Sequence, residues 1–349
     1  MKSNTSHTTG IRYISYLGQC VSIKSDYRIA LDVLESFLGS HFEFCEEWDG
    51  IVFANVSITR QSCPISLERF ASGERVFLRK SANAYFTIEG ERIADGTDEH
   101  VRCVRSGSII SFCGAEITVH IPFDGFALDV IELVRDLFFK RLESIGVVAL
   151  HSTVLERNGQ AVLVIGRKGA GKTTMALRLV KEHGFRFVSG DKAFVSIADE
   201  LPYVSGWPDY PHIGAGTLKS MPDLAEALGV GRESLATLPD THKMALDPGL
   251  FRRFVPHASQ THYPVRCILY PDVASRSSKG ITPLHQHADR LMTNIETAFS
   301  DTWKWTQFQR PSSDRTHTGI AELARLDAWQ IDGPLLNGTK WFDDARVHV

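Results

Sequence analysis

The N-terminal third of the chain consists of short runs of apolar, aromatic and β-branched residues, a pattern typical of β-strands. Such runs cover 10–23 and 51–58 and recur between 75 and 121, separated by Gly, Asn and Asp at hairpin spacing. The stretch Arg28–Leu38 instead has apolar residues at helical spacing. We therefore predict a β-rich first domain, residues 1–122, built as a meander or small sandwich with one amphipathic helix. No motif in it indicates a role.

The spacing of apolar residues then changes. Through 127–144 they recur every three or four positions, which predicts an amphipathic helix. Two strand-like runs follow, Val147–Glu156 and Gln160–Ile165. The Asn158-Gly159 pair between them is a strong hairpin signal, because both residue types tolerate positive φ. We assign residues 123–349 to a second domain, and the fold class as a whole to α/β.

The second strand of this hairpin leads into a segment with the pattern G-x-x-x-x-G-K-[ST]. Glycines let backbone N–H groups curl around phosphates without Cβ clashes, and a helix N-terminus behind them favours an anion. In such a loop the lysine reaches the β- and γ-phosphates and the first threonine coordinates Mg²⁺. The nucleotide-binding residues predicted on this basis are Gly166, Arg167, Lys168, Gly169, Ala170, Gly171, Lys172, Thr173 and Thr174.

A carboxylate is expected close to this loop. The helix that starts at Lys172 should end near His183-Gly184, and a short strand, 185–189, should follow it. Asp191 lies just after that strand, at the edge of the sheet where ligands collect in parallel α/β proteins. A carboxylate there can hold Mg²⁺ or accept a proton from an attacking hydroxyl.

Three further residues are candidates for substrate contact. The segment 206–214 is dense in turn formers and aromatic residues, and its Asp209 or His212 could face an acceptor. Lys243 could place a cation near the transferred phosphate. The alternatives are a structural Pro-rich loop for the first two residues and an ordinary solvated lysine for the third.

The block 149–195, ALHSTVLERNGQAVLVIGRKGAGKTTMALRLVKEHGFRFVSGDKAFV, resembles the catalytic core of the HPr kinase family. Relatives of that family include phosphoenolpyruvate carboxykinases and kinases of peptide-modification pathways. The resemblance implies a P-loop kinase core of the HPr kinase-like type. It matches His151 to the family histidine beside the catalytic carboxylate, and Gly166–Thr173 to the nucleotide loop. Asp191 matches one aspartate of the family's Asp-Asp pair.

At that pair the chain departs from the family, because it reads Ser189-Gly190-Asp191-Lys192 and offers a single carboxylate. Alignment on the apolar strand makes Asp191 the second aspartate, with Gly190 in place of the first. Alignment on Gly-Asp makes it the first, with Lys192 in place of the second. Both alignments stay open, and Asp191 is a base, a metal ligand or both. The family's acidic capping motif is not recognisable.

We therefore expect an enzyme, an ATP- and Mg²⁺-dependent kinase that transfers the γ-phosphate to a hydroxyl of a small molecule, a peptide or a protein. Lys172, Asp191 and His151 would be its catalytic residues, and Thr173 with Asp191 would hold the metal. One alternative is a non-catalytic ATP-binding regulatory module, which the missing second aspartate favours. The other is a small-metabolite kinase of the shikimate or nucleoside type, against which the antiparallel hairpin and the β-rich N-terminal part argue.

The composition limits the classes of partner that we expect for the protein. The chain has 38 Lys and Arg against 41 Asp and Glu, a net charge of −3, so it lacks the basic field of a nucleic-acid-binding protein. No apolar run approaches the ~20 residues that cross a bilayer, and the first thirty residues contain no secretion signal. We therefore expect a cytoplasmic protein with neither nucleic acid nor membrane as partner. The hexamers of the resembled family make a homo-oligomer plausible.

Overall fold

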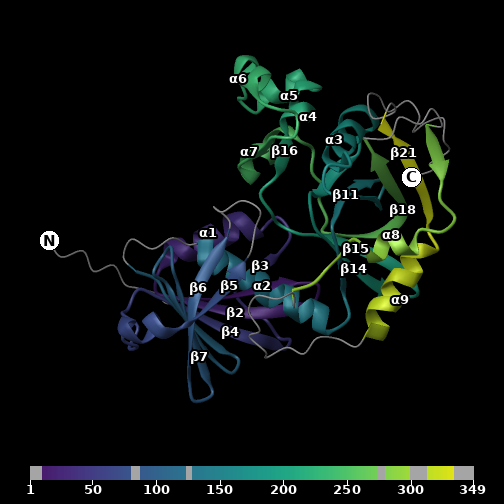
Figure 1. The fold of residues 1–349 in the computed structure, drawn as a ribbon. Helices are drawn as coiled ribbons and strands as arrows, with labels where there is room; N and C mark the ends of the chain where they lie inside the picture. Colours follow the sequence, from purple (N-terminus) through teal and green to yellow (C-terminus); the bar gives the residue numbers. More distant parts are fainter. Residues whose placement is uncertain (1–9, 80–86, 123–127, 274–279, 299–312, 334–349) are drawn as a thin grey trace. The chain divides into compact units, whose positions relative to one another are not determined.

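The computed structural model describes residues 10–79, 87–122, 128–273, 280–298 and 313–333, which form two compact units (Figure 1). Unit 1 contains the described residues up to Ile145, together with Thr297 and Ala298. Unit 2 contains Gly146–Glu296 and the described residues from 313 onward. The chain therefore passes from unit 1 into unit 2 after Ile145, returns to unit 1 at Thr297, and belongs to unit 2 again in the described residues from 313 onward.

In unit 1 the described strands form one mixed sheet, in the order β3-β1-β2-β4-β9-β8-β7-β6-β5. From β9 to β5 it is an antiparallel meander, whereas β2–β4 and β4–β9 pair in parallel. The strands are β1 (Ile11–Tyr16), β2 (Gln19–Ser25), β3 (Glu43–Cys45), β4 (Val52–Thr59), β5 (Glu74–Arg79), β6 (Ile88–Asp95), β7 (Asp98–Cys103), β8 (Ile109–Cys113) and β9 (Glu116–His120). The helices are α1 (Arg28–Leu38), a 3-10 helix (Leu67–Ser72) and α2 (Leu128–Ser144). The predicted β-rich part with a helix at Arg28–Leu38 is confirmed.

Helix α2, which the sequence analysis places in the second domain, lies in unit 1, so the division falls at Ile145/Gly146 and not at 122/123. The reason is aromatic packing that the sequence does not reveal. The ring of Phe138 on α2 packs edge-on against Tyr16, Phe42 and Phe53, at centroid distances of 6.5, 4.9 and 5.3 Å.

The end of α2 also holds the returning chain. The carboxylate of Glu143 accepts hydrogen bonds from Thr297 Oγ1 at 2.6 Å and from the backbone N–H of Ala298 at 2.7 Å. The chain that leaves unit 1 after Ile145 and the chain that returns to it at Thr297 are therefore tied to each other within unit 1.

Unit 2 is built on a second mixed sheet, with the strand order β13-β11-β12-β18-β15-β14-β10-β20 and with β21 beside β18 and β19 beside β21. Its strands are β10 (Val148–Leu150), β11 (Ser152–Arg157), β12 (Gln160–Ile165), β13 (Arg186–Ser189), β14 (Ala193–Ala198), β15 (Leu201–Gly206), β18 (His262–Asp272), β19 (Ile281–Pro283), β20 (Ile295–Glu296) and β21 (Asp327–Asp332). A separate pair is formed by β16 (His212–Gly214) and β17 (Lys243–Ala245). The helices are α3 (Lys172–His183), α4 (Ala215–Lys219), α5 (Pro222–Ala227), α6 (Arg232–Thr237), α7 (Pro248–Phe254), α8 (Ala288–Met292) and α9 (Ser313–Ala324). The prediction of a mixed α/β protein is confirmed.

The central strand β12 is buried on both faces. Val162 and Val164 belong to the core that contains Met175 and Leu179 of α3. Ala161, Leu163 and Ile165 belong to the opposite core, which contains Ile320 and Leu323 of α9. Burial on both faces explains why β12 is an uninterrupted apolar run without alternation. It also fixes the start of the glycine-rich segment that follows it.

The predicted hairpin is present, but its first strand is shorter than predicted. Asn158 and Gly159 both have positive φ, 54° and 78°, and β11 pairs with β12 in antiparallel register. The single strand predicted over Val147–Glu156 is wrong, because it breaks at His151. There the chain changes neighbours: β10 pairs with β14 and β20, whereas β11 pairs with β12 and β13.

The buried position of β12 gives a stability prediction. Leu163→Ala should lower the free energy of unfolding of unit 2 by about 2–5 kcal/mol, because it leaves a cavity at a fully buried position. Native-state hydrogen exchange of the β12 and β18 amides measures this loss. The matched control is Leu201→Ala on β15, where the side chain is 55% exposed and the change should stay within about 0.5 kcal/mol. Equal effects of the two substitutions would contradict the assignment of β12 as the core strand.

Candidate functional site

The glycine-rich segment connects the end of β12 to the first residue of α3, in the strand–loop–helix context that the sequence predicts. Two of its glycines have left-handed backbone conformations, Gly169 with φ of +83° and Gly171 with φ of +101°. The turn is closed by a hydrogen bond from the Ala170 N–H to the Arg167 carbonyl at 3.1 Å. A Cβ on Gly166 would lie 3.1 Å from that of Ala170. Glycine is therefore required by backbone conformation at two positions and by crowding at a third.

The neighbouring parallel strand β18 supports this loop from the side. The N–H of Val273, just after β18, donates to the Ala170 carbonyl at 3.0 Å. The last residue of β18, Asp272, therefore lies beside the loop, at the carboxyl edge of the parallel strands. The sequence analysis missed this carboxylate, although the run Cys267–Tyr270 before it is a recognisable buried strand.

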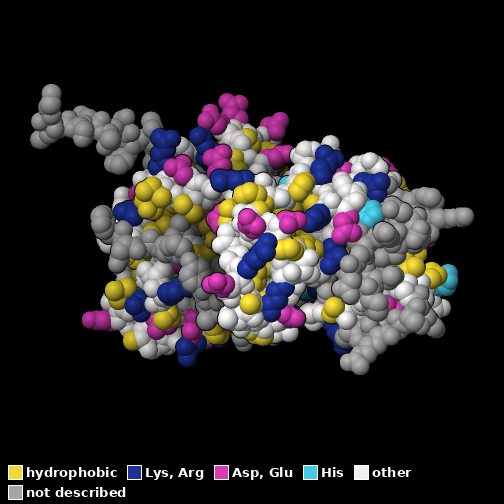
Figure 2. Space-filling view, turned by 90° about the horizontal axis from the view of Figure 1, so that it is seen from above, with side chains coloured by type: hydrophobic (Ala, Val, Ile, Leu, Met, Phe, Trp, Pro, Cys, Tyr) yellow, Lys and Arg dark blue, Asp and Glu magenta, His cyan; other side chains and the backbone are white. Residues whose placement is uncertain are grey.

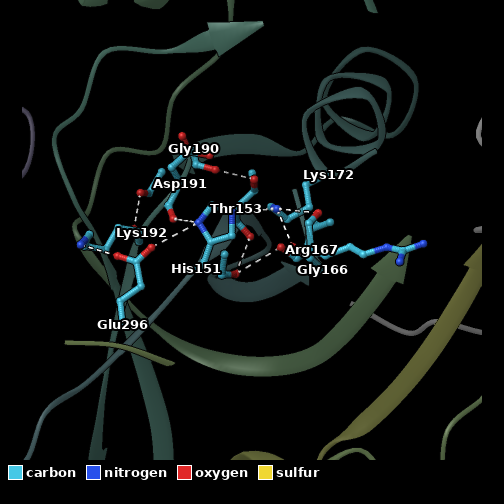
Figure 3. Close-up of polar contacts among 12 residues, drawn as sticks. His151, Thr153, Gly166, Arg167, Lys172, Gly190, Asp191, Lys192 and Glu296 are labelled. Atoms are coloured by element: carbon cyan, nitrogen blue, oxygen red, sulfur yellow. Dashed lines mark hydrogen bonds and ion pairs between the residues drawn. The ribbon is translucent and has the colours of Figure 1, made fainter. Parts of the chain in front are cut away.

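The side chain of Lys172 is buried, with 7% exposure. Its ammonium donates to the Gly166 carbonyl at 2.6 Å and lies 3.4 Å from the Arg167 carbonyl. It also lies 3.0 Å from Nε2 of His151 (Figure 3). Burial and the charge of Lys243 lower the pKa of Lys172 to about 8, against the opposing effects of the Asp191 and Glu296 carboxylates.

Asp191 lies in the turn between β13 and β14, which is held at several points. Thr153 Oγ1 donates to the Gly190 carbonyl at 2.6 Å, and Ser189 Oγ donates to the Lys192 carbonyl at 2.6 Å. The backbone carbonyl of Asp191 lies 3.0 Å from Nδ1 of His151. The structure thus brings together the predicted residues Asp191, His151 and Lys172. The imidazole of His151 contacts the backbone carbonyl of Asp191 through Nδ1 and the ammonium of Lys172 through Nε2 (Figure 3).

Glu296 completes this group, and the sequence analysis missed it. It lies on β20, which pairs with β10, so that Ala149 faces Glu296 and Leu150 faces Ile295. Its carboxylate forms an ion pair with Lys192 and lies 3.4 Å from Nδ1 of His151. Burial alone would raise the pKa of Glu296, but Lys192 and His151 lower it to about 2. No motif surrounds Glu296, so no sequence signal could have found it.

The pair β16–β17 and helix α4 lie next to the start of α3. Thr217 on α4 and Thr174 on α3 share a hydroxyl–hydroxyl hydrogen bond of 2.7 Å. On β17, Lys243 faces Gly214 and lies close enough to Lys172 to lower its pKa. This places the predicted Lys243 in electrostatic reach of the loop.

The other two candidates for substrate contact lie before and within β16. Asp209 is in the loop between β15 and β16, where its carboxylate accepts the Tyr210 N–H at 2.9 Å. His212 is the first residue of β16 and faces Ala245 of β17. Their roles toward an acceptor stay predictions.

The magnesium ion expected from the sequence stays a prediction. Within the described ranges, no group of three or more His, Cys, Asp or Glu side chains is arranged to hold a metal. Mg²⁺ differs from most metals here, because it usually takes only one or two protein carboxylates and fills its other positions with phosphate oxygens and water. Thr173, at the start of α3, and Asp191 are the residues that would hold it.

Figure 2 shows Lys and Arg side chains interspersed with Asp and Glu over the described part of the face in view. Among the helices that the structure describes, none is long and apolar enough to span a bilayer.

No protein-family model matches the chain, and no curated protein matches it.

The loop geometry gives a direct prediction. Gly171→Ala should lower the free energy of unfolding by roughly 1–2 kcal/mol, because a Cβ is strained at this left-handed position. Gly190→Ala is the matched control, since its nearest atom to an added Cβ is Phe187 Cζ at 3.6 Å, an ordinary contact. Denaturant unfolding compares the two variants. If Gly190→Ala proved as destabilising as Gly171→Ala, the assigned loop conformation would be wrong.

Proposed function

We propose that the protein is an ATP- and Mg²⁺-dependent kinase that transfers the γ-phosphate of ATP to a hydroxyl group of a small-molecule, peptide or protein acceptor. The observation that carries the proposal is the position of Lys172, at the first turn of a helix behind a left-handed glycine loop. One carboxylate, Asp191, acts on the charge of that lysine from the adjoining strand end.

The loop offers what a polyphosphate needs. The left-handed glycines leave backbone N–H groups without side chains to obstruct them, and the N-terminus of α3 adds its partial positive charge. The buried ammonium of Lys172 supplies a full charge within the same loop. A phosphate oxygen would take the place that the Gly166 and Arg167 carbonyls hold around this ammonium, and would stabilise its protonated form.

Phosphoryl transfer requires mainly positioning and charge stabilisation. The bound Mg²⁺ would supply charge neutralisation between the phosphates. Asp191, as base or as metal ligand, would face the acceptor hydroxyl or the metal, and His151 would hold the Asp191 backbone in place through its carbonyl. The resemblance to HPr kinases supports these assignments.

A non-catalytic ATP-binding module is the second candidate function. One observation favours it: Lys192, next to Asp191, forms an ion pair with Glu296, so the carboxylate of Glu296 is already neutralised by a cation. A shikimate-type kinase is less favoured, because β12 pairs on one side with the antiparallel strand β11.

Two substitutions distinguish these functions. Lys172→Ala should weaken Mg·ATP binding by tenfold or more, on the order of one lost charge-assisted hydrogen bond. Asp191→Asn should lower turnover by about a hundredfold or more while the Kd for Mg·ATP stays within about threefold. Calorimetry measures binding, and labelled ATP with a panel of amino acids, polyols and Ser-, Thr- and Tyr-containing peptides measures transfer.

The control for these variants is Asp199→Asn, on an exposed turn between β14 and β15, which should behave as the wild type. Absence of Mg·ATP binding by the wild type would overturn the proposal. Binding that is intact, with no turnover that depends on Asp191, would favour the regulatory module instead.

A further inference from the structure

The imidazole of His151 has acceptors on one side and a cation on the other. Its Nδ1 lies 3.0 Å from the backbone carbonyl of Asp191 and 3.4 Å from the carboxylate of Glu296. A carbonyl cannot donate a hydrogen bond, and neither can an ionised carboxylate. Nδ1 must therefore carry a proton, and it donates this proton to the two oxygens.

The other nitrogen then has a lone pair. In a neutral imidazole with its proton on Nδ1, Nε2 is an acceptor. It lies 3.0 Å from the ammonium of Lys172, which can only donate. All the polar neighbours of His151 described above are thus consistent with one tautomer and with no other.

Glu296 is itself fixed in place. Its backbone belongs to the β10–β20 pair, and the N–H of His151 donates to the carbonyl of Asn294, one residue before β20, at 2.8 Å. Its second carboxylate oxygen pairs with Lys192. The segment 294–296 therefore holds both the backbone and the ring of His151.

We propose that Glu296 is a positioning residue of the kinase site, which together with the Asp191 carbonyl holds His151 in the Nδ1–H tautomer and which neutralises Lys192. This inference rests on the proposed function. Glu296 acts through His151, whose Nε2 it turns into an acceptor for the ammonium of the nucleotide loop. It also cancels the positive charge that Lys192 brings next to Asp191. This carboxylate comes from a strand 105 residues later in the chain (296 − 191).

The tautomer can be measured without any nucleotide. In the full-length wild type, ¹⁵N NMR of labelled histidine should show His151 protonated on Nδ1. Glu296→Ala removes the acceptor at 3.4 Å and leaves the Asp191 carbonyl at 3.0 Å, so the Nδ1–H tautomer should lose population to the Nε2–H tautomer without disappearing. Glu322→Gln, which breaks an ion pair with Arg325 elsewhere in unit 2, is the control and should leave His151 unchanged.

Turnover gives the second readout. Glu296→Ala should lower kcat by about tenfold to a hundredfold, the usual effect of losing an outer-shell partner, with the Kd for Mg·ATP changed less than about threefold. Glu296→Gln keeps an acceptor but leaves Lys192 unmatched. The double variant Lys192→Met/Glu296→Gln keeps the acceptor and removes both charges, so it should recover kcat relative to Glu296→Gln alone. A purely structural role for Glu296 would instead change the unfolding free energy of Glu296→Gln and leave the kcat of its folded fraction unchanged.

The outcomes separate the two proposals. A wild-type His151 protonated on Nε2 overturns the inference about Glu296 whatever the activity. A loss of kcat in Glu296→Ala without a change of tautomer overturns it too. A wild type with the expected tautomer but no phosphoryl transfer overturns the proposed function, and with it the catalytic role of Glu296. If Glu296→Ala does not fold, Glu296→Gln and the double variant still decide the question.

Discussion

The burial of the Lys172 ammonium is the constraint on which the rest of the site depends. A cation removed from water must find acceptors, or its burial costs several kcal/mol. Here the acceptors come from two directions, the carbonyl groups of its own loop and the imidazole of His151. The first set closes the glycine loop on itself. The second connects the loop to the strand break at His151, and through it to Asp191 and Glu296.

This requirement explains the break between β10 and β11. A continuous strand would alternate its side chains and keep the same neighbours along its length. Instead, the chain changes neighbours at His151, whose N–H bonds to Asn294 while its ring lies between the loop lysine and β20. An interruption of a buried strand gives up ladder hydrogen bonds, which the contacts of His151 replace.

The parts of the fold that follow from local signals were predictable. The Asn158-Gly159 turn, helix α1, the left-handed glycines and the start of α3 depend on residues close together in sequence, and each agrees with the structure. The site beyond the loop depends on contacts between distant segments. Glu296 lies on a strand of two residues, too short for any period to be visible. Likewise, the apolar stripe of α2 predicts burial but not the partner, and the aromatic rings around Phe138 decide that it belongs to unit 1.

Two of the places where the chain crosses between the units are held together. The chain crosses between the units at 145–146 and at 296–297, and the hydrogen bonds of Glu143 to Thr297 and Ala298 fasten these two crossings together on the side of unit 1. On the other side they continue directly into β10 and out of β20, which are paired. Both crossings are therefore anchored on each side, by the carboxylate of Glu143 in unit 1 and by the β10–β20 pairing in unit 2, and the residue that follows Glu296 is the one whose hydroxyl Glu143 holds.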